Sequence, residues 1–249
     1  MADRTVEASP QLYARIGGAL YLLLIILGGF AEAFVRDRLI VSGDAAATAA
    51  NIMRMESLWR FGIVAEFLAL FGAIALAMIY FVLLKPVSRE INLLATFFRL
   101  VAMSVQAVAF LNLVTALFPL GDAAYLQAFT PEQLYALMSL AIRAQGHGYG
   151  LSLLFFGCCF LFHGYLIFRS GFLPRVLGIL IQIGGLCYMT YSFALFLAPA
   201  FANGIFPAVL IPCFIAEMSL CLWLLVKGVN VEKWKQANAQ AMRRAASTV

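Results

Sequence analysis

The sequence predicts an all-α membrane protein: a polytopic bundle of six transmembrane helices in three hairpins, with short outer-loop helices before spans two and four. Composition is the first observation behind this prediction. Of the 249 residues, 64% are hydrophobic and 12% are charged, whereas soluble domains are about 45–50% apolar and about 25% charged. The second observation is length, because crossing a bilayer takes roughly 20 mostly apolar residues. Six segments are long enough: Leu12–Phe34, Leu58–Leu84, Leu93–Phe118, Gly150–Phe168, Val176–Ala198 and Phe206–Val226.

The placement of positive charge is the third observation, and it gives the topology. One set of span ends carries most of the cations: Arg4, Arg15, Lys85, Arg89, Arg99, Arg169, Arg175, Lys227, Lys233, Lys235, Arg243 and Arg244. The opposite ends carry only Arg36, Arg38, Arg54, Arg60 and Arg143. Cytoplasmic loops of membrane proteins are enriched in Lys and Arg. The bias predicts that both termini are cytoplasmic, and it explains the net charge of +5 without a nucleic-acid partner.

The first span has an alternative interpretation as a cleaved signal peptide. A basic leader precedes the apolar stretch Ile16–Phe30, and Ala31-Glu32-Ala33 resembles a cleavage site. The stretch is long for a signal peptide and fits the topology as a first span. We therefore expect an uncleaved helix.

The connections predict where the helices begin and end. Pro and Gly in Lys85–Arg89 and Arg169–Arg175 favour tight cytoplasmic turns. Among the outer connections, Gly43-Asp44 predicts the start of a helix over Ala45–Ser57. Thr130-Pro131-Glu132-Gln133 has the form of a capping box and predicts a second outer helix. The third outer connection, Pro199–Pro207, is predicted to be a short uncharged loop.

The apolar segments and the polar end of the sequence predict that the chain has two parts. Residues 1–230 are predicted to form a single six-span transmembrane domain, and residues 231–249 a polar cytoplasmic tail that is frayed or disordered from Ala237. In the tail, Trp234 between Lys233 and Lys235 is typical of the membrane interface. The cysteines all lie within spans, which favours a packing role over disulfides or zinc binding: Cys158, Cys159, Cys187, Cys213 and Cys221.

Polar side chains form a stripe on the third span. Asn92, Thr96, Arg99, Met103 and Gln106 recur at steps of four and three residues, so they share one face of a helix. A polar face within a bilayer must meet protein or water. Two interpretations stay open: hydrogen bonds between helices with Arg99 snorkelling to the headgroups, or a binding site.

Two carboxylates within spans are further candidates. A carboxylate at such depth must pair with a cation or stay protonated. For Glu66 the expected partners are Arg60 and Arg99, unless Arg60 pairs locally with Glu56. Glu217 has no cation on its own span before Lys227, which makes it the stronger candidate. A separate pair is expected between Glu32 and Arg36, four residues apart, at the surface.

The two histidines, His147 and His163, lie 16 residues apart, too far apart around a helix to hold one metal ion together. His147 follows Gly146 at the outer entrance of span four, where Gly146-x-x-x-Gly150 permits close helix contact. It is either an interfacial residue or a ligand contact. His163 shares a face with Cys159.

Span five adds Gln182, Tyr188, Tyr191 and Ser192, and Pro207 and Pro212 are expected to kink span six near Glu217. We expect polar groups of spans two to six to converge in a cavity. The candidate ligand-binding residues are Arg99, Gln106, Glu66, Gln182, Glu217 and His147. No catalytic residue, cofactor, metal site or oligomeric state is assigned. The chain lacks G-x-S-x-G, H-E-x-x-H, Walker A and G-x-G-x-x-G motifs.

Several segments resemble a bacterial membrane family known as domain of unknown function 4386. They are Ala14–Gly18, Leu83–Val87, Gly164–Gly178, Tyr191–Phe193, Glu217–Leu220 and Leu222–Asn230. The resemblance implies a six-span protein of the bacterial cytoplasmic (inner) membrane with no established activity. The chain departs from that family at Cys159, where members carry His. A shared catalytic His at that position is therefore in doubt.

Three functions are compatible with these features. The first is binding or movement of a small or lipid-like molecule in a polar cavity within the membrane. The second is an intramembrane enzyme that uses Glu and His in acid–base or metal chemistry. The third is a structural or signalling subunit whose polar faces bind a partner helix. Three hairpins of the same sense do not match the inverted repeats of many transporters, which disfavours active transport.

Overall fold

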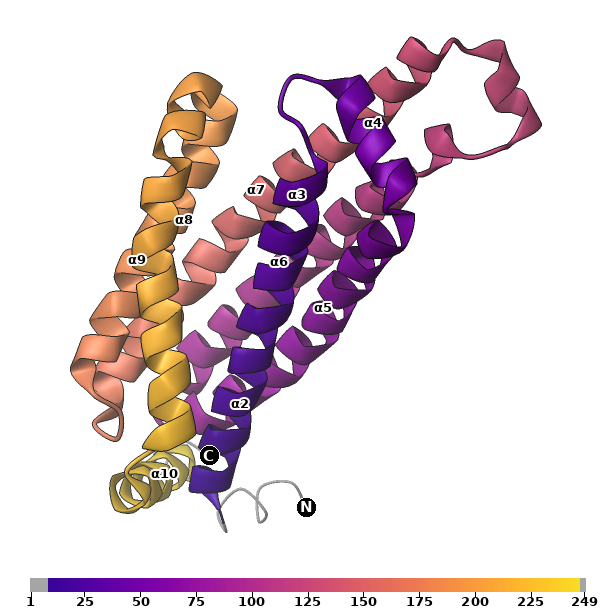
Figure 1. Ribbon diagram of the computed structural model, residues 1–249. Coiled ribbons are helices and arrows are strands. Elements are labelled where there is room, and N and C mark those ends of the chain that lie inside the picture. The colour runs from indigo at the N-terminus through magenta and orange to yellow at the C-terminus, as the bar shows by residue number, and fades with distance from the viewer. Residues whose placement is uncertain (1–8, 247–249) are drawn as a thin grey trace. The chain divides into compact units, whose positions relative to one another are not determined.

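The computed structural model describes residues 9–246, and over those residues its regular elements are all helices (Figure 1). In chain order they are α2 (Pro10–Gly29), the π-helix η1 (Phe30–Arg36), α3 (Asp37–Leu39), α4 (Ala45–Arg54), α5 (Glu56–Leu84), α6 (Arg89–Thr115), the 3₁₀ turns η2 (Phe118–Leu120) and η3 (Ala124–Ala128), α7 (Pro131–Ser170), α8 (Arg175–Leu197), α9 (Pro199–Val226) and α10 (Val231–Ala246). Arg4 and the last three residues of the predicted tail lie outside the described residues.

Within residues 9–246, six helical segments are long and apolar enough to cross a membrane: Pro10–Leu39, Glu56–Leu84, Arg89–Leu120, Pro131–Ser170, Arg175–Leu197 and Ala208–Val226. Their outward-facing side chains are large and apolar. Phe71 on α5 is 70% exposed and Leu197 at the end of α8 is 81% exposed. Exposure of such side chains is unfavourable in water but not in lipid. The predicted fold class is confirmed: the chain is an all-α, multi-pass membrane protein.

The outer connections differ from the predictions in two places. Asp44 caps α4 as expected, since its carboxylate accepts from the Ala47 N–H at 2.8 Å. The Thr130–Gln133 capping box also forms. However, the helix that it starts does not end before span four but continues through it as the 40 residues of α7. Pro199–Pro207 is not a loop either: α9 starts directly after Ala198, with Pro199 at the first helical position, where its missing N–H costs nothing.

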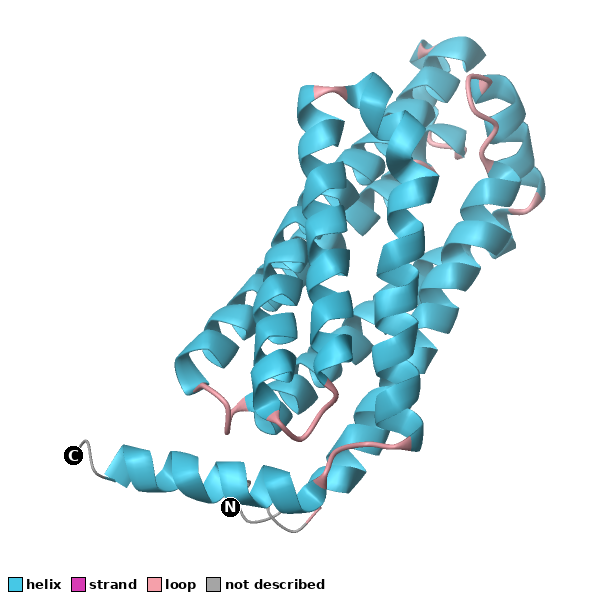
Figure 2. Cartoon of the chain, turned by 90° about the vertical axis from the view of Figure 1, so that its left-hand side faces the viewer, coloured by secondary structure: helices cyan, strands magenta, loops and turns pink. Residues whose placement is uncertain are grey.

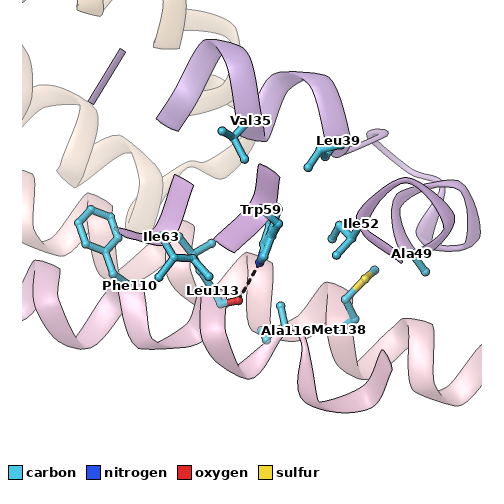
Figure 3. Close-up of a cluster of buried hydrophobic side chains, with 11 residues drawn as sticks. Val35, Leu39, Ala49, Ile52, Trp59, Ile63, Phe110, Leu113, Ala116 and Met138 are labelled. Atoms are coloured by element: carbon cyan, nitrogen blue, oxygen red, sulfur yellow. Dashed lines mark hydrogen bonds between the residues drawn. The ribbon is translucent and has the colours of Figure 1, made fainter. Parts of the chain in front are cut away.

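The chain divides into two compact units, which are described separately. Unit 1 comprises the described part of Met1–Leu22, Gly72–Ala102 and Ser152–Val249, and unit 2 comprises Leu23–Phe71 and Met103–Leu151. Unit 2 is organised around the apolar cluster drawn in Figure 3, in which Trp59 is 1% exposed. Its indole N–H donates to the Leu113 carbonyl at 3.0 Å. This bond joins α5 to α6 within the cluster.

In unit 1, glycines bring α7 and α8 into close contact. Gly164 faces Gly178, and Gly157 faces Gly185: a β-carbon on Gly164 would lie 2.6 Å from the Gly178 carbonyl oxygen, and one on Gly157 would lie 2.7 Å from that of Gly185. Small residues permit this approach of backbones in membrane helices. We call these four residues the glycine seam. α8 also lies beside α9 (Figure 1).

The end of unit 1 that includes the start of α2 and the end of α9 is held by specific hydrogen bonds. Gly228 has a φ of +69° and ends α9. The Gln11 amide of α2 donates to the Lys227 carbonyl at 2.8 Å and accepts from the Val229 N–H at 3.0 Å. Beyond this turn, α10 runs across the direction of α9 (Figure 2).

Over its described residues the tail is a helix, α10, as far as Ala246, which agrees with the helical alternative predicted for it rather than with disorder. The Trp234 side chain packs inside the protein. It is 2% exposed, and its indole N–H donates to the Leu83 carbonyl at 2.9 Å. This bond fixes α10 to the end of α5.

Candidate ligand-binding site

Arg99 carries the charge of the candidate site in unit 1. Its side chain is 2% exposed. The guanidinium carbon lies 5.2 Å from the centre of the Phe156 ring and 5.6 Å from that of Tyr80, distances at which ring faces attract a cation. Arg99 lies ten residues after the start of α6 at Arg89, about 15 Å along the helix. The enclosed position excludes the snorkelling alternative.

The guanidinium keeps donors without partners. Arg99 Nε and Nη1 are buried and have no hydrogen-bond partner among the described residues. These two atoms carry three of the five N–H donors of an arginine. The Cys159 thiol interacts with the guanidinium as well, but no carboxylate of the described residues lies within 4 Å of it. A buried charge without a counter-ion destabilises a fold by several kcal/mol.

Two neighbouring side chains also carry unpartnered polar atoms. The hydroxyl of Tyr80, on α5, and Nε2 of His163, on α7, are buried and lack partners among the described residues. The two rings lie 5.2 Å apart. His163 Nδ1 is 3.3 Å from Cys159 Sγ, which fixes the orientation of the imidazole. Tyr80 packs on Arg99, His163 interacts with Arg99 electrostatically, and each of the two residues keeps a buried hydrogen-bonding group without a partner among the described residues.

A small cavity adjoins these groups. Its surface is almost wholly apolar, and its lining residues are Tyr21, Tyr80, Leu84, Phe160, His163, Ile167, Ile181 and Leu220. The space has room for about one water molecule. Arg99 is not among the lining residues but is connected to them through the rings of Tyr80 and His163.

Glu217, on α9, lies near the same cluster. It accepts a hydrogen bond of 2.5 Å from the Tyr188 hydroxyl of α8, and the Tyr21 hydroxyl of α2 also hydrogen-bonds it. Tyr21 packs edge-on against Tyr80, with ring centres 6.3 Å apart. A continuous series of aromatic side chains thus connects Glu217 to Arg99. Glu217 and Arg99 interact electrostatically, but they are not among the ion pairs of the described residues.

The rest of the polar stripe on α6 has structural partners. The Asn92 amide donates to the Phe81 carbonyl at 2.6 Å, and the Thr96 hydroxyl donates to the Asn92 carbonyl at 2.8 Å. Gln182 lies against Gly164 in the glycine seam. These contacts favour packing roles for Asn92 and Thr96. Asn92 Oδ1 is itself buried without a partner among the described residues, so Arg99 is the residue of the stripe in unit 1 that keeps unused N–H donors.

In unit 2, Glu66 has a partner that the sequence did not predict. Neither Arg60 nor Arg99 pairs with it: Arg36 Nη1 donates to Glu66 Oε1 at 2.7 Å. The same guanidinium binds Glu32, four residues earlier, which confirms the predicted Glu32–Arg36 pair. Arg60 binds Glu56 at 2.7 Å, as the local alternative predicted. The π-helix Phe30–Arg36 changes the helical register, and no sequence pattern indicated that change.

The other two candidates also belong to unit 2. His147 is exposed, and its Nδ1 lies 2.9 Å from the Arg143 carbonyl oxygen on the preceding turn. Gln106 is half-buried. The close contact predicted at Gly146 is made instead by Gly148, which packs on Ala109, while a β-carbon on Gly146 would meet nothing within 4 Å. As ligand contacts, Gln106 and His147 remain predictions.

Nothing in the described part of the chain favours a metal centre, since no group of three or more His, Cys, Asp or Glu side chains there is placed to hold an ion. The five cysteines are free thiols. The arrangement in unit 1 instead combines a fixed cation, unused donors and a carboxylate, a combination suited to binding a polar molecule. Three residues of this arrangement, Tyr21, Tyr80 and Phe156, carried no sequence signal, because an aromatic in an apolar span resembles any other packing residue.

Comparisons with known proteins give a family but no activity. A family model described as Domain of unknown function (DUF4386) matches residues 16–228. An "Uncharacterized protein" of the archaeon Archaeoglobus fulgidus is 29% identical to the chain over 168 residues, which cover 68% of this chain and 84% of the relative. No solved structure matches the chain.

Proposed function

The chain belongs to the DUF4386 family, and since that membership brings no activity with it, we propose a function from the buried groups of the chain itself. The protein binds a small or lipid-like molecule at a polar site within the membrane. Arg99 and Glu217 in unit 1 are the principal contacts. Gln182 is a further candidate in the same unit. Glu66, Gln106 and His147 are separate candidates for ligand contacts within unit 2.

One observation carries this proposal: Arg99 is 2% exposed, and two of its nitrogen atoms lack any hydrogen-bond partner among the described residues. Buried polar groups in folded proteins are nearly always hydrogen-bonded, and exceptions call for a specific reason. Ionisable residues within spans are expensive and mark binding or transport pathways. A bound molecule that pairs with Arg99 supplies such a reason. A purely structural arginine would be expected to have a full set of partners, as Arg36 does.

We also propose a location. The protein lies in the cytoplasmic membrane of a bacterium, in contact with membrane lipid and without a nucleic-acid partner, and both termini face the cytoplasm. Exposed cations at one end of unit 1 support this orientation: Arg15, Arg89, Arg169, Arg175, Lys227, Lys233 and Lys235.

Native mass spectrometry of the purified protein tests the binding function. The wild-type protein is expected to carry a co-purified species that is lost, or weakened about tenfold or more, in Arg99→Met. Arg175→Met is the matched control, because Arg175 also packs on a ring, that of Phe168 at 5.6 Å, but is exposed. It should bind the species as the wild type does. Loss of the species in both variants, or in neither, would contradict the proposal.

The same variants give a stability readout. Replacing a buried, unpaired cation with an apolar side chain of similar length should leave the unliganded fold as stable as before, or up to about 3 kcal/mol more stable. Thermal unfolding in detergent measures this difference. A large destabilisation in Arg99→Met would instead assign Arg99 a structural role.

A further inference from the structure

We infer that the ligand carries an anionic oxygen-acid head, a carboxylate or a phosphate, held by Arg99, Tyr80 and His163. The inference rests on the proposed binding function and adds the chemical class of the ligand. It follows from three features of unit 1: the charge balance, the number of unused donors, and the apolar wall that adjoins them.

The charge balance of unit 1 lacks an anion beside Arg99. The guanidinium is always charged in proteins. Of the acidic residues that the structure describes in unit 1, Glu90 and Glu232 are exposed, and Glu217 is bound by the hydroxyls of Tyr188 and Tyr21. None of them forms an ion pair with Arg99. An anionic ligand would supply the negative charge that balances Arg99, whereas a neutral or cationic ligand would not.

The unused groups are mainly donors. Arg99 offers three N–H groups on Nε and Nη1, and Tyr80 offers its hydroxyl. His163 Nε2 adds a donor in the tautomer that accepts the Cys159 S–H at Nδ1. A single water molecule has two lone pairs and no charge, so it cannot satisfy this set. A carboxylate accepts about four hydrogen bonds and a phosphate more. The donor set therefore favours an oxyanion.

An apolar cavity lies beside the side chains of Tyr80 and His163. The cavity that Tyr80 and His163 line is closed on its other sides by Leu84, Ile167 and Leu220 among others. A hydrocarbon chain attached to the anion would contact this wall and offset the cost of carrying a charge into the membrane. With room for about one water molecule, the described conformation must open before such a ligand can enter.

Thermal unfolding of the full-length protein in a neutral detergent tests the class of ligand. Decanoate and decyl phosphate present the two heads on one tail, decanol presents the same tail without charge, and acetate and inorganic phosphate present the heads alone. We expect at least one of the charged amphiphiles to raise the midpoint in the wild type and in Arg175→Met, and not in Arg99→Met. Decanol should not raise it. Stabilisation by acetate or phosphate as well would identify a free anion as the source, and stabilisation by the amphiphiles alone would identify a lipid-like one.

A second variant, Tyr80→Phe, keeps the test decisive if Arg99→Met fails to fold. Tyr80→Phe removes one unpartnered hydroxyl and keeps the ring against Arg99 and His163, so it should fold normally and weaken the response to the anion several-fold. Equal responses to decanoate and decanol, or an unchanged response in both variants, would overturn the anionic class. An Arg99-dependent but neutral species in native mass spectrometry would also overturn it while the binding function stands. No species and no response to any probe would overturn both.

Discussion

Two arginines within the spans differ in how their charge is balanced. In unit 2, Arg36 binds Glu66 and Glu32, so its guanidinium has carboxylate partners. In unit 1, Arg99 is more deeply buried and lies against the rings of Tyr80 and Phe156 and the Cys159 thiol, without an ion-pair partner among the described residues. The first arrangement is complete and holds α5 to the π-helix. The second lacks an anionic partner among the described residues, and the proposed ligand binding rests on that lack.

At the scale of single residues, we predict that replacing two carboxylates, Glu66 and Glu56, lowers the stability by different amounts. Glu66→Gln should destabilise the protein by about 1–3 kcal/mol, because it removes a buried partner of Arg36 while Glu32 remains. Glu56→Gln should cost less than about 1 kcal/mol, since the Glu56–Arg60 pair is exposed, with side chains 50% and 62% accessible. Thermal unfolding in detergent compares the two. Equal losses would show that the Arg36–Glu66 pair does not stabilise unit 2.

At the scale of elements, the glycine seam determines how α7 and α8 meet. The closest contacts include backbone carbonyl oxygens of the facing helix, and these cannot move aside as the end of a side chain can. His163 is adjacent in sequence to Gly164, and Tyr188 lies three residues after Gly185. The seam therefore sets the positions of two side chains of the candidate site.

Gly164→Ala is predicted to lower the stability by about 1–3 kcal/mol, because its methyl group would lie 2.6 Å from the Gly178 carbonyl oxygen. Gly146→Ala, in the same helix, is the control. Its methyl group meets nothing within 4 Å, and alanine is the better helix former by about 1 kcal/mol. Gly146→Ala should therefore unfold at the same or a higher temperature. A Gly164→Ala protein as stable as the control would contradict the close approach.

At the scale of the whole molecule, the charge distribution makes a topological prediction. Green fluorescent protein fused after Val249 should fluoresce, because it matures in the cytoplasm, and alkaline phosphatase fused there should be inactive. A phosphatase fusion that ends the chain at Gly43, in the connection after α3, should be active. The reverse pattern would place both termini outside.

The membrane-spanning segments could be predicted from the sequence, because the length of an apolar segment can be counted without knowledge of the tertiary structure. The sequence was insufficient where backbone hydrogen bonding continues through polar residues, as in α7, which runs unbroken across the segment around His147. In the site, the period of α6 indicated Arg99. Its neighbours Tyr80, Phe156 and His163 come from two other helices, and their approach depends on helix rotations that only packing determines.

The glycine seam has a consequence for the order of assembly. Its contacts join residues 14 and 28 positions apart, 164 with 178 and 157 with 185. They lie within one helical hairpin, so closing it requires no helix from elsewhere in the chain. Such sequence-local contacts form early. The α7–α8 hairpin can therefore close as soon as both helices are inserted, and α9 would then bring Glu217 to a Tyr188 that is already in place.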